Sequence, residues 1–554
     1  MLDDRVGPHH QRGTASLHRV IWLYQQLSWF ISRYHLISRY KAKHFRLIVE
    51  KTVRAVRLIA VASLVGSVLA GVALAAEDKP PTGSSEPPAL VETQHSITIN
   101  GHPLEYRAIA ETIGLTDQKG EPSASVFTVA YLAEPAAGER RPVAFVFNGG
   151  PGAASVFLHL GALGPRILDT PPSGAVPNPP IHLIDNTATW LAFTDLVFID
   201  PVGTGFSRGK GKEDNPDKPF WNVQSDINSL GAVARRWLTR HQRWNSAVYL
   251  VGESYGGFRA AAMARSLPRD VGITVSGLVL LSPALDTTIL HPDISDILAP
   301  AFNLPSFAAT AAALAGRSAP DAMSEAEHFA LTDYPAGIAA IKGVPPAGDP
   351  FITRVAQLIG LPEDVVRKAR GRVSGHLFAR ELRRDRGEVL SLYDGTVTRP
   401  STSDPANDNA GDPVLDASIA AYTAAFQTYA ESELGYRTEQ PYRVLPREVS
   451  REWNWDSGHE GGGLGLPLSA LENTLFAHPE TRLLIANGRY DLVTPYLASR
   501  WLIDQLSVPA EIRSGIRLRV YEGGHMMYMR PISRAALAAD AAELFAPETG
   551  GTKR

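Results

Sequence analysis

The chain has 554 residues, of which 44% are hydrophobic and 20% charged, and its formal net charge is −3. This composition is ordinary for a globular protein, and so small a charge gives no electrostatic footprint for nucleic acid. The chain contains no cysteine, which excludes a disulfide framework, a thiolate zinc site and a cysteine nucleophile.

The N-terminal region carries an export pattern. Residues 1–57 form a poorly defined extension that mixes aromatic and basic residues. The apolar run "LIAVASLVGSVLAGVALAA" (58–76) follows Arg57 and ends on small residues. This is typical of a signal peptide, with cleavage expected after Ala75. The sequence therefore predicts an exported protein, periplasmic or extracellular; an uncleaved membrane anchor and a buried helix are the alternatives.

About 50 residues precede this signal, more than such a signal usually has, which suggests that the assigned start codon lies too far upstream. The Pro/Ser/Gly-rich stretch 77–90 is predicted to be a flexible linker. Next, "SITINGHPLEYRAI" places two strand-like runs around Asn100-Gly101, which indicates a β-hairpin. The run 125–132 predicts a third strand.

Short apolar runs separated by helical stretches then predict parallel strands that are covered on both faces. The alternating run 516–520 is the expected edge strand. We therefore predict an α/β sheet with helices on both faces, an N-terminal β-hairpin and a mostly helical cap insertion. The five apolar runs are 143–147, 195–199, 247–251, 277–281 and 482–486.

The predicted core has two parts, residues 91–289 and 471–548. Between them, the insertion 290–470 is expected to cover one end of the sheet, with helical runs at 302–314, 364–370 and 415–433. A final helix is expected over 533–545, with Ser533 as its cap.

The stretch "GESYG" places Ser254 between the strand at 247–251 and a helical run, and fits the pattern G-x-S-x-G. A sharp strand-to-helix turn of this kind, the nucleophile elbow, exposes a serine Oγ above the strand ends. A tight turn with a capping serine is the alternative interpretation.

A serine nucleophile needs a base, which in an α/β-hydrolase follows an acid later in the chain. Asp491 lies five residues beyond one predicted strand, and His525 follows the last strand. We expect His525 to accept the proton of Ser254 and Asp491 to hold the imidazole. His159 and His459 are interpreted as structural or solvated.

The tetrahedral intermediate also needs N–H donors for its oxyanion. The N–H of Tyr255, the residue after the nucleophile, is one candidate. The other is expected from the glycine-rich loop "NGGPG" (148–152), which follows the strand at 143–147. An ordinary Gly-Pro turn is the alternative for this loop.

The chain resembles the serine carboxypeptidases of the α/β-hydrolase fold through four motifs in the same order. These are "NGGPG", "DPVGTGFS" (200–207), "GESYGG" and "GGHM" (523–526). By this resemblance, Asn148 and Glu253 bind the free C-terminal carboxylate of a peptide. Two carboxyl groups share a proton best at acid pH. The resemblance further implies substrate contacts from Gly149 and Met526. It places the oxyanion donors at Gly150 and Tyr255.

The chain departs from the family pattern at several positions. Val146 stands where the family has tryptophan, Ala162 where it has a second acidic residue, and Ala153 where it has cysteine. The first two normally help to hold the substrate carboxylate. Recognition of the C-terminus therefore depends on two of four residues, and we expect a bacterial branch with a rebuilt carboxylate site.

The leading hypothesis is an exported serine carboxypeptidase, a peptidase without metal or cofactor that acts on peptides with a free C-terminus through an acyl-enzyme. An esterase or acyltransferase on the same triad is the second hypothesis, and a catalytically silent envelope binding protein is the third. No nucleic-acid partner is expected, membrane contact only if segment 58–76 remains uncleaved, and the oligomeric state stays open.

Overall fold

The computed structural model describes residues 88–134, 140–290, 292–402, 411–455 and 466–546. The extension 1–57, the segment 58–76 and most of the linker lie outside these residues. Within them, no helix combines the length and the hydropathy needed to cross a membrane.

The described chain begins with the predicted hairpin. Strands β1 (Leu90–Ile99) and β2 (His102–Thr116) pair antiparallel, and Ile99 lies opposite His102. The two turn residues, Asn100 and Gly101, both have positive φ, as a two-residue hairpin turn requires. Strand β3 (Pro122–Ala133) then pairs antiparallel with β2. Both predictions are confirmed.

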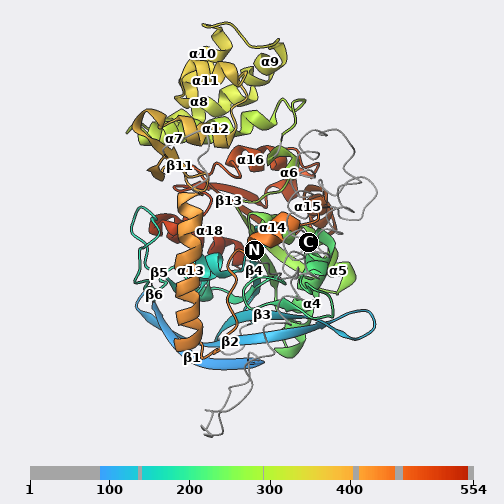
Figure 1. Cartoon of the computed structure of the whole chain (residues 1–554). Helices are drawn as coiled ribbons and strands as arrows, with labels where there is room; N and C mark the ends of the chain where they lie inside the picture. Colours follow the sequence, from blue (N-terminus) through green and yellow to red (C-terminus); the bar gives the residue numbers. More distant parts are fainter. Residues whose placement is uncertain (1–87, 135–139, 291, 403–410, 456–465, 547–554) are drawn as a thin grey trace, which may run out of the picture. The chain divides into compact units, whose positions relative to one another are not determined.

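Six parallel strands continue the same sheet in the order β7-β4-β9-β10-β13-β14, with β7 antiparallel to β3 (Figure 1). The predicted edge strand, β14, does lie at an edge, and the order is that of an α/β-hydrolase sheet. The remaining short strands pair with β3 or in two-stranded sheets. The bounds are β4 Val143–Phe147, β5 Arg166–Leu168, β6 Leu183–Asp185, β7 Asp195–Ile199, β8 Arg208–Gly209, β9 Val248–Glu253, β10 Val275–Leu281, β11 Glu388–Leu390, β12 Thr398–Pro400, β13 Arg482–Gly488 and β14 Ile516–Tyr521.

Alternate residues of the central strands face two separate hydrophobic cores, because successive side chains of a strand point to opposite faces. Phe145 packs with α4, α5 and α15, whereas Ala144 and Val146 pack with α3, α13 and α18. Helices therefore cover both faces, as predicted. The helices of the body are α3 Val156–Leu158, α4 Val223–Arg240, α5 Tyr255–Asp270, α6 Thr287–Leu290, α15 Leu466–Ala477, α16 Tyr496–Asp504, α17 Ala510–Arg513 and α18 Pro531–Phe545, with a π-helix at His159–Leu163 and single 3₁₀ turns at Trp190–Ala192, Lys218–Phe220 and Met527–Met529.

The insertion contributes two different structures. Residues 299–390, here called the helical lobe, have a core of their own around Phe307 and Phe378, which also packs on Leu492 and α16. The later helix α13 instead lies along the body, where Tyr422 and Phe426 join the core beneath α3 (Figure 1). The helices are α7 Leu304–Leu314, α8 Ala319–Leu331, α9 Asp333–Ala340, α10 Pro350–Ile359, α11 Glu363–Lys368, α12 Gly375–Glu381, α13 Pro413–Ser432 and α14 Arg447–Glu452, with 3₁₀ turns at Ala299–Asn303 and Arg384–Arg386.

One local prediction was wrong. The last helix, α18, begins at Pro531 and has Arg530 at its cap position, without a side-chain cap. Ser533 lies inside the helix, where its hydroxyl donates to the carbonyl of Glu522. Proline is favoured in the first turn of a helix, because the N–H that it lacks has no intrahelical partner there.

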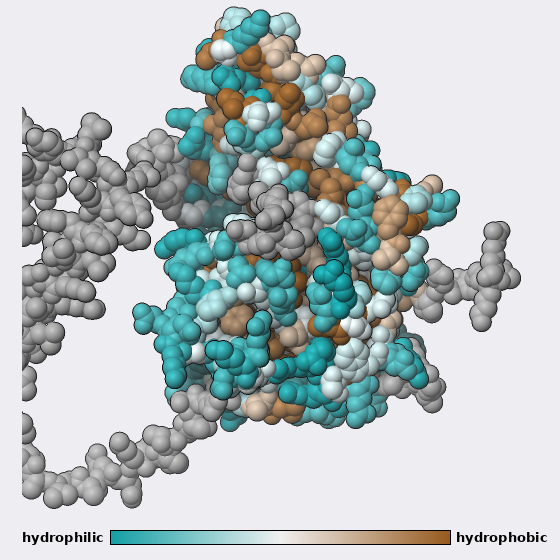
Figure 2. Space-filling view, turned by 90° about the vertical axis from the view of Figure 1, so that its right-hand side faces the viewer, coloured by the Kyte–Doolittle hydropathy of each residue, from teal (hydrophilic) through white to brown (hydrophobic). Residues whose placement is uncertain are grey.

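Figure 2 shows that hydrophobic side chains gather on the upper part of this side of the molecule, whereas the lower part is mainly hydrophilic. Exposed large apolar residues of the helical lobe include Leu331 and Val344.

Candidate active site

Ser254 occupies the turn between β9 and α5. Its φ of 59° and ψ of −123° are rare for a residue with a side chain and mark a strained turn. Glycine is required on both sides: a Cβ at Gly252 would lie 2.0 Å from the carbonyl oxygen of Gly256, and one at Gly256 would lie 2.6 Å from that of Phe147. Ser254 is partly buried. These features are those of a nucleophile elbow.

Asp491 and His525 lie together at the carboxyl ends of β13 and β14. The Nδ1 atom of His525 is 2.9 Å from Oδ2 of Asp491, and both side chains are buried. The backbone N–H groups of Val493 and Thr494 donate to Oδ1 of Asp491, and the Thr494 hydroxyl donates to Oδ2. This carboxylate is therefore fixed in place and orients the imidazole so that Nδ1 faces Asp491.

The three catalytic loops are joined through the end of β10. The carbonyl oxygen of Leu281 accepts from the N–H of Ser254 at 2.9 Å, and the hydroxyl of Ser282 donates to the carbonyl of His525 at 2.9 Å. The Ser282 carbonyl oxygen also lies 3.0 Å from the Thr494 hydroxyl oxygen, so the single proton of this hydroxyl is shared between Ser282 and Asp491. A single backbone turn thus holds the loops of Ser254, Asp491 and His525 against one another.

Burial by itself would lower the pKa of His525, but the hydrogen bond to Asp491 and the negative charges of Asp491, Glu253 and Asp412 together raise that pKa above its ordinary value. An imidazole with a raised pKa is a stronger base. A residue of the insertion also reaches this histidine: the ring of Tyr393 stands edge-on to it, with centroids 5.1 Å apart.

The loop "NGGPG" presses directly on the elbow. A Cβ at Gly149 would lie 2.6 Å from the Tyr255 nitrogen and 2.8 Å from the Ser254 Cβ, so only glycine permits this approach. Gly150 has a φ of 99°. No hydrogen bond joins the N–H of Gly150 or of Tyr255 to any other residue that the structure describes. Both groups are thus available as donors for an oxyanion.

Comparison with known proteins agrees with this arrangement. Residues 107–287 match the family model described as serine carboxypeptidase. The resemblance to the serine carboxypeptidases is confirmed. The chain is 25% identical over 210 residues to serine carboxypeptidase-like 33 of Arabidopsis thaliana, which covers 35% of this chain and 41% of that protein. It is 39% identical over 70 residues to the pheromone-processing carboxypeptidase KEX1 of Komagataella phaffii, or 12% of this chain and 10% of that protein.

The chain therefore spans less than half the length of these curated relatives. Among solved structures, the crystal structure of esterase E22 covers 80% of this chain and 100% of its own, with 14% identity and a TM-score of 0.36.

Asn148 and Glu253, which occupy the motifs "NGGPG" and "GESYGG", contact each other next to Ser254. The amide nitrogen of Asn148 donates to Oε2 of Glu253 at 2.8 Å, and its amide oxygen accepts from the N–H of Leu158. The hydroxyl of Tyr528 donates to the same Oε2 atom at 2.6 Å. Only 4% of Glu253 is exposed. The sequence reasoning missed Tyr528, whose only signal was its place three residues after His525.

Burial raises the pKa of Glu253 to about 7, against the nearby His525 and the hydrogen bonds from Tyr528 and Asn148, which lower it. The carboxyl is therefore protonated at acid pH and can then donate a hydrogen bond. At the two positions where serine carboxypeptidases have larger side chains, Val146 and Ala162 are both buried in the core.

The other predicted residues have simpler surroundings. His159 is buried in a π-helix, where its Nε2 atom lies 2.6 Å from the Tyr131 hydroxyl, and burial lowers its pKa to about 3. A structural role fits this position; His459 lies outside the described residues. Met526 is buried next to His525. In "DPVGTGFS", Oδ1 of Asp200 accepts from the N–H and the hydroxyl of Ser155, so this motif supports the end of the oxyanion loop.

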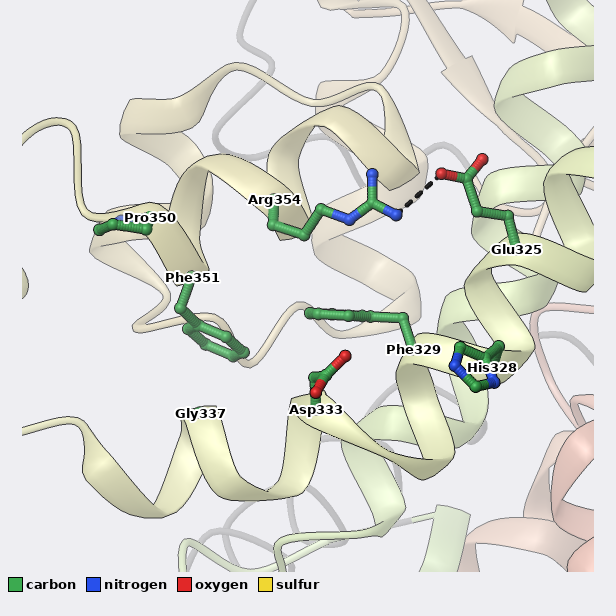
Figure 3. A pocket seen from close by; sticks show the side chains of 8 residues that line it. All are labelled: Glu325, His328, Phe329, Asp333, Gly337, Pro350, Phe351 and Arg354. Carbon is green, nitrogen blue, oxygen red and sulfur yellow. Dashed lines mark hydrogen bonds and ion pairs between the residues drawn. The ribbon is translucent and has the colours of Figure 1, made fainter.

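A separate hollow of about 500 Å³ lies in the helical lobe, between α8, α9 and α10 (Figure 3). Phe329 and Phe351 line it, and Arg354 pairs with Glu325 at its rim. The residues that line this hollow include none of the catalytic loops, so we do not assign the chemistry to it.

Proposed function

We propose that this protein is a serine carboxypeptidase that removes C-terminal residues from peptides through an acyl-enzyme. The observation that carries the proposal is the serine at a strained elbow together with a buried His525–Asp491 pair at the same edge of the sheet. The match to the serine carboxypeptidase family supports the choice of peptides as substrates.

In the proposed reaction, Ser254 Oγ attacks the carbonyl carbon of the last peptide bond while its proton passes to Nε2 of His525. The N–H groups of Gly150 and Tyr255 stabilise the negative oxygen of the tetrahedral intermediate. His525 then gives the proton to the leaving amine, and the C–N bond breaks. A water molecule next attacks the carbonyl carbon of the acyl-enzyme and gives one proton to His525. The bond between that carbon and Ser254 Oγ then breaks, His525 returns the proton to Oγ, and the acid leaves.

Asn148 and Glu253 would hold the substrate's C-terminal carboxylate, with Gly149 and Met526 beside it. Both of these donors to Glu253 meet at Oε2, so we assign the contact with the substrate carboxylate to Oε1. A protonated Glu253 can donate to a carboxylate, whereas an ionised one would repel it. Since the pKa of Glu253 is about 7, this binding favours acid pH.

A second candidate, an esterase or acyltransferase on the same triad, is favoured by one observation. Val146 and Ala162 contribute only small, buried side chains, and Glu253 is already bonded to two protein donors. A site this closed could have lost its affinity for a carboxylate.

The test compares an N-blocked dipeptide acid with its C-terminal amide and its ester, at pH 5 and pH 8. A strong preference for the free acid, greatest at pH 5, is expected of a carboxypeptidase. Equal or better turnover of the ester at pH 8 would instead identify the second candidate.

We also propose that the protein is exported, with the chain cleaved after Ala75. N-terminal sequencing of the protein from the cell exterior should find a start after Ala75. Recovery of residues 1–50 on that protein would contradict the cleavage.

A further inference from the structure

A buried ion pair lies directly behind the oxyanion loop, and the reaction above does not use it. Arg259, on α5, is fully buried, and Asp226, on α4, is 3% exposed. Nε of Arg259 donates to Oδ2 of Asp226 at 2.7 Å, and one terminal nitrogen donates to Oδ1 at 3.2 Å. Burial raises the pKa of Asp226, and the guanidinium opposes this shift.

The third nitrogen of the guanidinium reaches the oxyanion loop. Its NH1 group donates to the backbone carbonyl of Asn148 at 2.5 Å. Because a peptide unit is planar, fixing this carbonyl also fixes the start of Gly149, which presses on the elbow. The next residue, Gly150, supplies one of the two free N–H donors.

The same pair contacts the residue that supplies the other donor. The guanidinium carbon of Arg259 lies 4.9 Å from the ring centre of Tyr255, and the Tyr255 hydroxyl is 3.4 Å from Oδ2 of Asp226. A cation over an aromatic face is attracted to it, most strongly where water is excluded. One ion pair therefore touches both segments from which the donors come.

We propose that Arg259, oriented by Asp226, is a positioning residue that sets the relative placement of the two oxyanion donors. This inference rests on the proposed function. A planar guanidinium can bind a carboxylate with two nitrogens and still donate with the third, whereas a lysine ammonium is a single point donor. Arg259→Lys should therefore keep the charge pairing and lose the hold on Asn148.

The chain offers a matched control. Arg141 is also buried, pairs with Asp195 at 2.9 Å and donates to the backbone carbonyl of Leu191 at 2.5 Å. This pair lies at the amino ends of β4 and β7, away from the catalytic loops. Arg141→Lys thus makes the same chemical change where no oxyanion donor is affected.

The experiment measures kcat and KM for an oxoester and the corresponding thionoester, in which sulfur replaces the carbonyl oxygen. Sulfur is a weak hydrogen-bond acceptor, so a thionoester gains little from an oxyanion hole. For Arg259→Lys we expect kcat on the oxoester to fall about tenfold to a hundredfold with KM within threefold, and kcat on the thionoester to fall much less. Arg141→Lys should leave kcat on both esters within about twofold of wild type, even if it lowers thermal stability as much as Arg259→Lys does.

Unchanged kcat in folded Arg259→Lys, or an equal loss on both esters, would overturn the inference. If that variant does not fold, Asp226→Asn tests the same point, because it preserves side-chain shape and weakens the anchor of the guanidinium. The expected result is again a selective loss on the oxoester, and an equal response of both esters again contradicts the inference.

Ser254→Ala separates this inference from the proposed function. If hydrolysis survives that substitution, the proposed function fails. If hydrolysis requires Ser254 but Arg259→Lys retains its kcat, only the positioning role fails.

Discussion

Glu253→Gln tests how this protein binds a carboxylate and how its stability depends on pH. In the folded chain the Glu253 pKa is about 7, against an ordinary 4.5. Below pH 4.5 the carboxyl is protonated in both the folded and the unfolded chain, so its contribution to stability is constant. Between pH 4.5 and 7 only the unfolded chain releases the proton, and the free energy of unfolding falls as pH rises, by about 3 kcal/mol in total.

Glutamine cannot ionise, and its amide oxygen can accept the bonds that Asn148 and Tyr528 give to Oε2. Relative to wild type, Glu253→Gln should therefore gain about 3 kcal/mol of stability between pH 4.5 and pH 8. Urea unfolding at both pH values measures this gain. A stability difference between the two proteins that does not change with pH would refute the assigned pKa.

The same variant tests substrate binding. For an N-blocked dipeptide acid, wild-type KM should rise about tenfold per pH unit above pH 7, because ionised Glu253 repels the substrate carboxylate. The KM of Glu253→Gln should stay flat over that range. Because the charge of Glu253 helps to raise the pKa of His525, the substitution also lowers the His525 pKa. The KM of the C-terminal amide, which has no carboxylate for Glu253 to bind, is therefore measured over the same pH range as the control. Parallel KM profiles for wild type and variant would refute carboxylate binding at this residue.

Three further substitutions test other parts of the site. Gly149→Ala adds a Cβ only 2.6 Å from the Tyr255 nitrogen, and should reduce kcat about a hundredfold; a kcat within threefold of wild type would show that the loop can yield. Tyr528→Phe removes a donor that stabilises ionised Glu253, so the pKa of Glu253 should rise. The increase in KM should then begin at a higher pH in the variant than in wild type, and the same starting pH in both proteins would contradict this role. Asp491→Asn should lower kcat about 10⁴-fold, since the imidazole loses its orienting carboxylate, and kcat near wild type would place the acid elsewhere.

The sequence was sufficient for features encoded by short local patterns. The hairpin at Asn100-Gly101 and the buried strands followed from turn residues and apolar runs. The elbow followed from glycine spacing, because each glycine there faces backbone that a Cβ would strike.

Features that depend on tertiary contacts could not be predicted in this way. The separation of α13 from the helical lobe depends on which core each helix joins, and helical periodicity does not specify that. Likewise, Arg259 follows the elbow on α5 and Tyr528 follows His525, but their contacts with Asn148 and Glu253 join segments far apart in the chain, which local sequence patterns do not specify. The start of α18 was predicted at Ser533 but lies at Pro531, which shows that a proline can determine where a helix begins even when a serine that could cap it is close by.

The most direct test of the proposed function is the release of free amino acids from a peptide of known sequence, by wild type and by Ser254→Ala. The account predicts stepwise release from the C-terminus by wild type between pH 6 and 7, where Glu253 is still partly protonated and His525 partly unprotonated. It predicts no release from the same peptide with an amidated C-terminus, and none by the variant. Release from the amidated peptide, or release that survives Ser254→Ala, would contradict it.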